Sequence, residues 1–258
     1  MARGVSTVLD VAVCLLLITA AVATLTVDFP DSTPDPTPNA DEIAGVLATS
    51  TTAVHADDRV THRTAFGHLA AAAVTNATVG DDALAASSDP SEVQADVEND
   101  LEDRTAVTAT WQPYPNASIA GDVAVGEPPP PDAAVGSTAT TVDIGLQPVT
   151  GDGFECLSRS LADAVIAWLF PPSQLRPALV DGRTADETAE RYRRTATTVD
   201  ASVEEELTEA NPHAINDELS SALAPKLEAE LRDEFDTPES AAEHISTEVE
   251  IVVRRWVP

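Results

Sequence analysis

TEVEIVVRRWV, residues 247–257, decides the class of fold that this chain can adopt. Val249, Ile251 and Val253 alternate here with polar or charged neighbours. A period of two predicts a strand that buries one face and exposes the other. Such a half-buried strand is typical of an antiparallel sheet, so other segments of the chain are expected to pair with it.

Two earlier segments show the same period. They are TAVTATWQPY at 105–114 and TTVDIGLQP at 140–148. The residues expected on their buried faces are Val107, Ala109 and Trp111 in the first segment, and Val142, Ile144 and Leu146 in the second. The four consecutive prolines at 128–131 predict a long extended loop between them, because proline excludes helix. The three strands are expected to share one sheet.

Helical periodicity dominates the sequence from Phe154 onward, where hydrophobic residues recur at steps of three and four. Helices are expected over 154–170, 184–203 and 211–235, and the first should lie across the sheet. Pro225 is expected to break or kink the third helix. The predicted fold class is therefore α+β, with a small, mostly antiparallel sheet and helices packed on one face.

The N-terminal region is expected to add a single transmembrane helix over residues 5–27. These 23 residues contain one charged side chain, Asp10. As a helix they would span about 35 Å, which exceeds a hydrocarbon core of about 30 Å. The predicted domains are a basic segment at 1–4, this helix, a Pro-rich linker at 28–40 and an exported acidic domain at 41–258. The flanking charges predict a cytoplasmic N-terminus and an extracellular domain.

Residues 3–17, RGVSTVLDVAVCLLL, resemble the start of type IV pilin-like (prepilin-type) subunits. The resemblance implies cleavage after Gly4 and an assembly role for Asp10, with oligomers formed through the leader helix. Two other interpretations of the segment remain open. One is an uncleaved signal anchor, and the other is a secretory leader cleaved near Ala23, which would release a soluble protein.

The charge of the chain excludes some partners. The 44 acidic and 14 basic residues give a net charge of −30, and residues 1–27 contribute nothing to it. Such an excess disfavours binding to nucleic acid. The acidic, lysine-poor composition resembles that of exported, membrane-anchored proteins of halophilic archaea. At about 1 M salt the Debye length falls to about 3 Å and screens most of the self-repulsion.

The motif search finds no catalytic signature, no cofactor fingerprint and no metal site. His55, His62 and His68 have spacings that match no common zinc pattern. Asn76 and Asn116 begin N-glycosylation sequons, which fit an exported domain. We therefore expect a membrane-anchored cell-surface protein with a structural or assembly role, such as a pilin-like or secretion-associated subunit. The main alternative is a surface-tethered enzyme or ligand-binding module.

Overall fold

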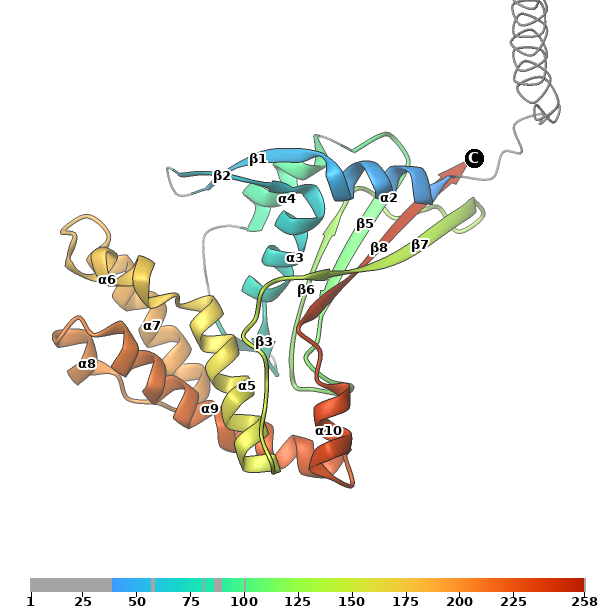
Figure 1. Ribbon diagram of the computed structural model, residues 1–258. Coiled ribbons are helices and arrows are strands. Elements are labelled where there is room, and N and C mark those ends of the chain that lie inside the picture. Colours follow the sequence, from blue (N-terminus) through green and yellow to red (C-terminus); the bar gives the residue numbers. More distant parts are fainter. Residues whose placement is uncertain (1–38, 57–58, 81, 86–89, 100, 258) are drawn as a thin grey trace, which may run out of the picture. The chain divides into compact units, whose positions relative to one another are not determined.

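The computed structural model describes residues 39–56, 59–80, 82–85, 90–99 and 101–257, which belong to one compact unit (Figure 1). Its helices are α2 (Ala40–Thr49), α3 (Ala65–Thr75), α4 (Pro90–Glu98), α5 (Phe154–Leu169), α6 (Pro172–Val180), α7 (Ala185–Val199), α8 (Glu204–Thr208), α9 (Pro212–Glu234) and α10 (Pro238–His244). Its strands are β1 (Thr51–Ala56), β2 (Arg59–Thr64), β3 (Thr78–Val79), β4 (Asp82–Ala83), β5 (Thr105–Trp111), β6 (Ile119–Val125), β7 (Ala134–Asp143) and β8 (Glu248–Val257).

The main sheet has six strands in the order β4-β3-β6-β5-β8-β7, and every neighbouring pair is antiparallel. Strand β8, the segment that opened the sequence analysis, lies between β5 and β7 and pairs with both. This confirms that the three segments predicted to be strands share one sheet. Strands β1 and β2 form a separate antiparallel hairpin.

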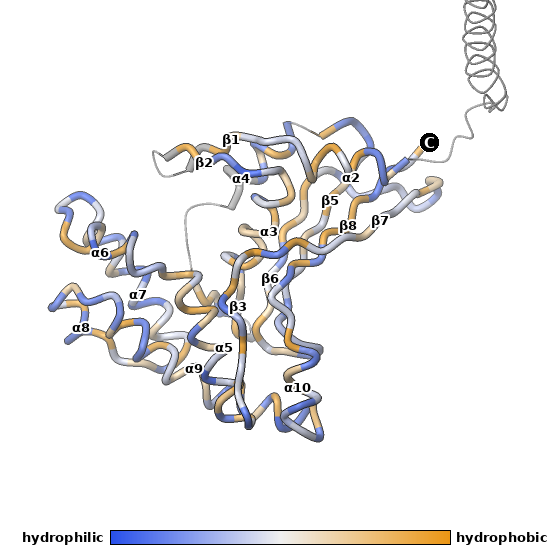
Figure 2. The backbone as a smooth tube through the Cα atoms, in the orientation of Figure 1, coloured by the Kyte–Doolittle hydropathy of each residue, from blue (hydrophilic) through white to orange (hydrophobic). Residues whose placement is uncertain are grey.

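One face of the sheet is buried, as the alternating pattern predicts. Val249, Ile251 and Val253 are fully buried, and so are Val107 and Trp111 on the neighbouring strand β5. Helix α3 packs against β5 and β6 on this face. Figure 2 shows hydrophobic and hydrophilic residues alternating along the strands of the sheet. The hydrophobic effect thus fixes which face of each strand meets the helices.

Strand β6 occupies part of the segment that we expected to be loop. Its residues Ile119, Gly121, Val123 and Val125 face the core, so the period of two was present but weakened by a glycine. Gly121 is required there, because a Cβ atom would lie only 2.1 Å from the main-chain oxygen of Ala73. The prediction of one long loop between the two strands is therefore wrong.

Strand β7 also differs from its predicted bounds. It begins at Ala134 and ends at Asp143, so Ile144 and Leu146 lie beyond it. The Asp143 carboxylate accepts a hydrogen bond from the main-chain N–H of Gly145 at 2.7 Å, and Gly145 has a φ of +73°. This turn, of the kind that Asp and Gly favour, ends the strand.

Helix α5 packs chiefly along α9, and not across the sheet as expected. Both helices have a fully buried stripe, which includes Leu161 and Val165 in α5 and Leu219 and Leu223 in α9. Helix α9 continues through Pro225 without ending. Pro225 is exposed, so water can reach the carbonyl group left without its helical hydrogen bond, while packing of the opposite face holds the helix together.

The predicted fold class needs a correction. The described residues form an α+β fold with a wholly antiparallel sheet, but none of their helices combines the length and apolar character that a bilayer crossing requires. The corrected fold class is α+β without a membrane-spanning helix in the part of the chain that the structure describes. Residues 5–27, to which that helix was assigned, and the linker up to residue 38 lie outside the described residues.

Candidate functional site

The main surface feature is the free edge of strand β7. All ten of its residues pair with β8 on one side, and among the described strands none pairs with the other side. In an antiparallel ladder every second residue directs its N–H and C=O groups away from the neighbour. Seven of the ten side chains are exposed and none is buried. This edge therefore presents a row of main-chain donors and acceptors to solvent.

Edge strands are usually protected by charge or by proline, and β7 has neither along most of its length. Asp143, at its last position, is its one charged residue. The strand is rich in small and β-branched residues, and Val135 remains 44% exposed. In a chain of which 22% is charged, nine consecutive uncharged residues leave this edge open to pairing with another strand.

The solvent-facing side of the sheet continues from this edge with small side chains. One cross-strand row runs from β7 to β6, and its members are Ala139, Val252, Thr108 and Ala124. Both alanines in this row are exposed. The surface is therefore flat at its centre, with the long charged side chains of β8 placed toward its two ends.

Those charges are separated along β8. Glu248 and Glu250 lie near its start, and Arg254 lies near its end on the same exposed face. Glu250 also lines a hollow of about 410 Å³. Neither the Arg254 guanidinium nor the Glu250 carboxylate has an ion-pair or hydrogen-bond partner within the described residues. The face next to the open edge thus has an acidic end and a basic end, both unpaired.

The opposite edge of the sheet is closed by helix α7. Strand β4 has only two residues there. The Thr195 hydroxyl donates to the main-chain oxygen of Leu84 at 2.5 Å, and the Thr198 hydroxyl donates to that of Ala83 at 3.0 Å. Side chains of α7 thus satisfy two carbonyl groups at this edge.

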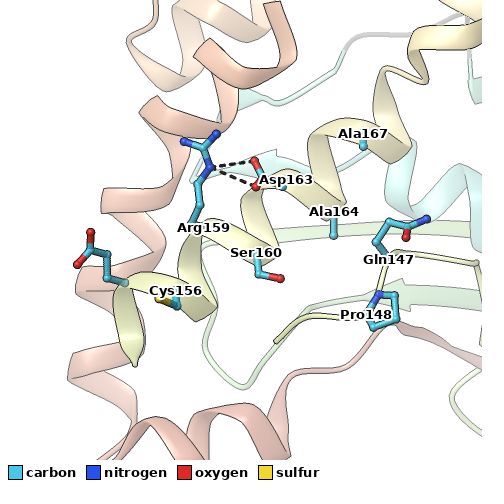
Figure 3. A pocket seen from close by; sticks show the side chains of 9 residues that line it. Gln147, Pro148, Cys156, Arg159, Ser160, Asp163, Ala164 and Ala167 are labelled. Atoms are coloured by element: carbon cyan, nitrogen blue, oxygen red, sulfur yellow. Dashed lines mark hydrogen bonds and ion pairs between the residues drawn. The ribbon is translucent and has the colours of Figure 1, made fainter. Parts of the chain in front are cut away.

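A second concave feature lies beside helix α5, where a hollow of about 540 Å³ opens between the helix and the loop that precedes it (Figure 3). Its lining residues are Gln147, Pro148, Glu155, Cys156, Arg159, Ser160, Asp163, Ala164 and Ala167. Cys156 is an exposed free thiol. The loop approaches the helix closely at Gly151, where a Cβ atom would lie 2.6 Å from that of Cys156.

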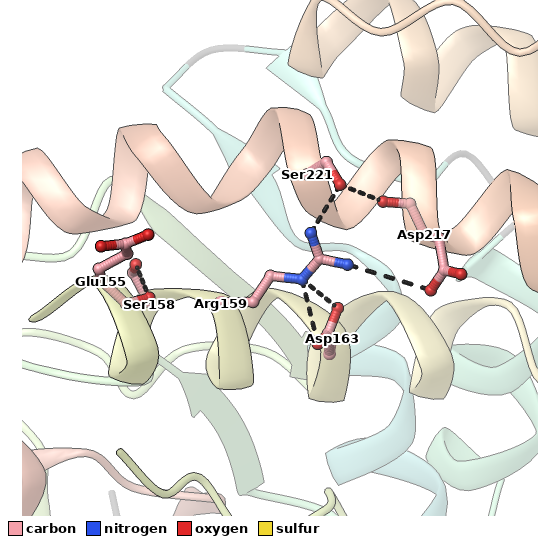
Figure 4. Close-up of polar contacts among 6 residues, drawn as sticks. All are labelled: Glu155, Ser158, Arg159, Asp163, Asp217 and Ser221. Carbon is pink, nitrogen blue, oxygen red and sulfur yellow. Dashed lines mark hydrogen bonds and ion pairs between the residues drawn. The ribbon is translucent and has the colours of Figure 1, made fainter. Parts of the chain in front are cut away.

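Arg159, Asp163 and Ser160 of this hollow already have partners, and Figure 4 shows those of Arg159. Arg159 Nε lies 3.0 Å from Asp163 Oδ1, and Arg159 Nη1 donates to Ser221 Oγ on α9 at 2.6 Å. The Ser160 hydroxyl accepts a hydrogen bond from the main-chain N–H of Thr150 at 3.1 Å. No histidine is among the nine lining residues, so neither the thiol nor the serine has an imidazole base beside it. These contacts join α5 to α9 and to its preceding loop.

One comparison with known proteins gave a match. A model described as a family of unknown function, DUF7284, matches residues 9–256. The chain belongs to this family. No curated protein and no solved structure matches it.

In this DUF7284 chain both sequon asparagines are held by hydrogen bonds. Asn76 Nδ2 donates to the main-chain oxygen of Asp122 at 3.2 Å. Asn116 Nδ2 donates to the carboxylate of Glu234 at 3.1 Å. The Ser118 hydroxyl, the third position of the second sequon, donates to Glu230 at 2.5 Å. Asn76 is the half-buried C-cap residue of α3, and Asn116 lies in the exposed loop between β5 and β6, next to the end of α9.

Glu230 is the centre of a network that sequence reasoning missed. It accepts hydrogen bonds from the Tyr114 hydroxyl at 2.8 Å and from the main-chain N–H of Ser118 at 3.0 Å. Burial, and then the adjacent Glu230 carboxylate, raise the pKa of Tyr114. Because the partners are more than 110 residues apart in sequence, no local pattern indicates the contact. It holds the loop after β5 against α9.

The described histidine side chains form no metal site. His68 is buried in α3, and its Nε2 lies 3.0 Å from the main-chain oxygen of Thr52. Burial is the largest influence on it and lowers its pKa. His62 is exposed on β2, whereas the side chain of His55 is outside the described residues. Among the residues that were described, no group of three or more metal-binding side chains occurs. Gly4, Asp10 and Ala23 lie outside the described residues as well.

Proposed function

We propose that this protein has a structural, non-catalytic role, in which the open edge of β7 receives a strand from a partner subunit. The observation that carries the proposal is the pairing of all ten residues of β7 on one side only. Main-chain hydrogen bonds provide affinity in this mode of binding, and the flanking side chains provide specificity.

The contrast with the hollow beside α5 supports an assembly role over a catalytic one. There Arg159 and Ser160 are engaged in contacts that join structural elements. The β7 edge instead offers unpaired main-chain groups next to unpaired charges on β8.

The assembly role is tested by a lysine placed in the middle of the edge. Ala139→Lys gives the edge strand a charged residue of the kind that natural edge strands use to prevent pairing, and it is expected to remove the full-length protein from its native complex. Ala124→Lys is the matched control, because Ala124 is also exposed and lies in the same cross-strand row on β6. Complex size would be measured by sedimentation of native cell extracts in high salt. Retention of the Ala139→Lys protein in the complex would contradict the proposal.

We also propose that the domain works outside the cell. Support comes from the acidic excess, which lies wholly in residues 28–258 and suits a highly saline exterior. Cys156 permits a direct test because its thiol is exposed. A membrane-impermeant maleimide should label the protein on intact cells, and Cys156→Ala should abolish the label. Labelling of the wild-type protein only after lysis would show an interior location.

A further inference from the structure

The charges beside the open edge restrict which strand can pair with it. Glu250 and Arg254 are four residues apart on β8, so their Cα atoms are about 13 Å apart along the strand. They point to the same exposed face as Ser137 and Thr141 of β7, which pair with Arg254 and Glu250 respectively. A strand that pairs with β7 therefore passes a basic position near Ser137 and an acidic position near Thr141.

A second β7 in antiparallel orientation satisfies this pattern. Opposing residues in a sheet must point to the same face, so the two-fold axis has to pass midway between the two copies of one residue. With the axis at Ala139, Ser137 of one copy lies opposite Thr141 of the other. The Arg254 side chain of one copy then faces the Glu250 side chain of the other across these two small residues. Because of the symmetry, the same contact forms twice.

A parallel, in-register pair of β7 strands has the opposite effect. It would place Arg254 beside Arg254 and Glu250 beside Glu250. In the antiparallel pair, each Asp143 lies opposite the exposed Val135 of the other copy, so the one charged residue of β7 meets no carboxylate across the strand pair. The hollow that Glu250 lines leaves space beside its carboxylate for an incoming guanidinium.

We propose that the strand received by β7 is the β7 of a second copy of this chain, which joins two six-stranded sheets into one continuous antiparallel sheet. This inference rests on the proposed assembly role and names the partner. Two-fold pairing gives a closed, isologous interface, so it makes dimers and does not make filaments.

Salt concentration controls this dimer. Two chains, each with a net charge of −30, repel one another at low ionic strength. Screening at about 1 M salt, where the Debye length is about 3 Å, removes most of this long-range repulsion. Salt weakens the two Arg254–Glu250 contacts as well, but each exposed ion pair contributes only about 0–1 kcal/mol. The main-chain hydrogen bonds and short-range packing between the paired strands are affected little by salt. Dimerisation is therefore expected to strengthen as salt is added.

The first test measures the dissociation constant of the purified full-length protein by sedimentation equilibrium. It compares about 1 M salt with the lowest salt concentration at which circular dichroism shows the chain folded. We expect the constant to fall at least about tenfold in the higher salt, and Ala139→Lys to abolish the dimer in both. The Ala124→Lys protein should dimerise like the wild type. A monomer at every salt concentration would overturn the second copy as partner.

The second test exchanges the two charges. Arg254→Glu and Glu250→Arg should each weaken dimerisation about tenfold, because each places like charges across the two-fold axis. The double exchange should restore the wild-type constant to within about threefold. The dissociation constants should be measured at the lowest salt concentration at which the wild-type protein dimerises. The denaturation midpoint of each variant shows whether it is folded. A double variant as weak as the single ones would overturn the antiparallel register.

The outcomes for the two proposals are distinguishable. If the purified protein stays monomeric while Ala139→Lys still leaves the native complex, β7 receives a strand from a different subunit and the assembly role stands. If the purified protein dimerises and Ala139→Lys has no effect on the dimer, the interface lies elsewhere and this inference fails. If Ala139→Lys also stays in the native complex, the proposed function fails too.

Discussion

One edge of the six-stranded sheet ends in the two-residue strand β4, whereas the other edge is the ten-residue strand β7. Hydroxyl groups of α7 satisfy main-chain oxygens at the first edge. No described strand pairs with the outer side of the second edge. The two edges therefore differ in protection, and only the β7 edge is available as a template for pairing with another strand.

The largest expected effect lies toward the closed edge. Gly121→Ala on β6 puts a methyl group 2.1 Å from the main-chain oxygen of Ala73, and backbone cannot move aside as a side chain can. We expect the free energy of unfolding to fall by about 3 kcal/mol, the upper end of the usual range for overpacking. Chemical denaturation in high salt measures it. Ser137→Ala on the exposed β7 edge is the control and should change the value by less than about 0.5 kcal/mol.

A smaller effect is expected where α7 caps the edge. Thr195→Val keeps the shape of a fully buried side chain but leaves the main-chain oxygen of buried Leu84 without its donor. The free energy of unfolding should fall by about 1–3 kcal/mol. Thr198→Val removes the equivalent bond to Ala83, which is exposed, so water can replace the hydroxyl. Equal losses in the two variants would mean that burial does not distinguish these contacts.

The smallest expected effect is a difference in the exchange rates of amide hydrogens along β7, which requires no change in the stability of the protein. In a monomer, the alternate amides of β7 that point away from β8 should exchange at least about tenfold faster than those bonded to β8. In high salt the dimer should remove this difference. Hydrogen–deuterium exchange followed by NMR measures it residue by residue. Uniform protection along β7 in the monomer would show that some other segment covers the edge.

Much of the sheet could be predicted from the sequence because burial on one face leaves a period of two. Strands β5 and β8 show that period clearly, with fully buried Val107, Trp111, Val249 and Ile251. Strand β6 was missed because Gly121 interrupts its hydrophobic series. The predicted bounds of β7 were wrong because none of its side chains is buried. Without buried positions, the hydrophobic period of two that marks β5 and β8 is weak in β7.

The candidate site could not be predicted for the same reason. An open edge has no neighbouring strand. A hydrophobic period of two arises only where side chains are buried against other elements, so it gives no sign of a strand that lacks a neighbour. The uncharged run at 134–142 was the available signal, because charged residues make up 22% of the chain. The hydrogen bonds from Tyr114 to Glu230 and from Arg159 to Ser221 join distant parts of the chain. They depend on tertiary packing, so no local sequence pattern predicts them.

The position of β8 sets the order in which the sheet can form. Strands β5 and β6 are close in sequence and can pair early, but β7 pairs with neither of them. Its partner is made only after the 104 residues that separate Asp143 from Glu248 have left the ribosome. Until then β7 has both sides free. Completion of the sheet therefore follows translation of the helical segment, and the nascent chain carries an unpaired strand throughout that interval.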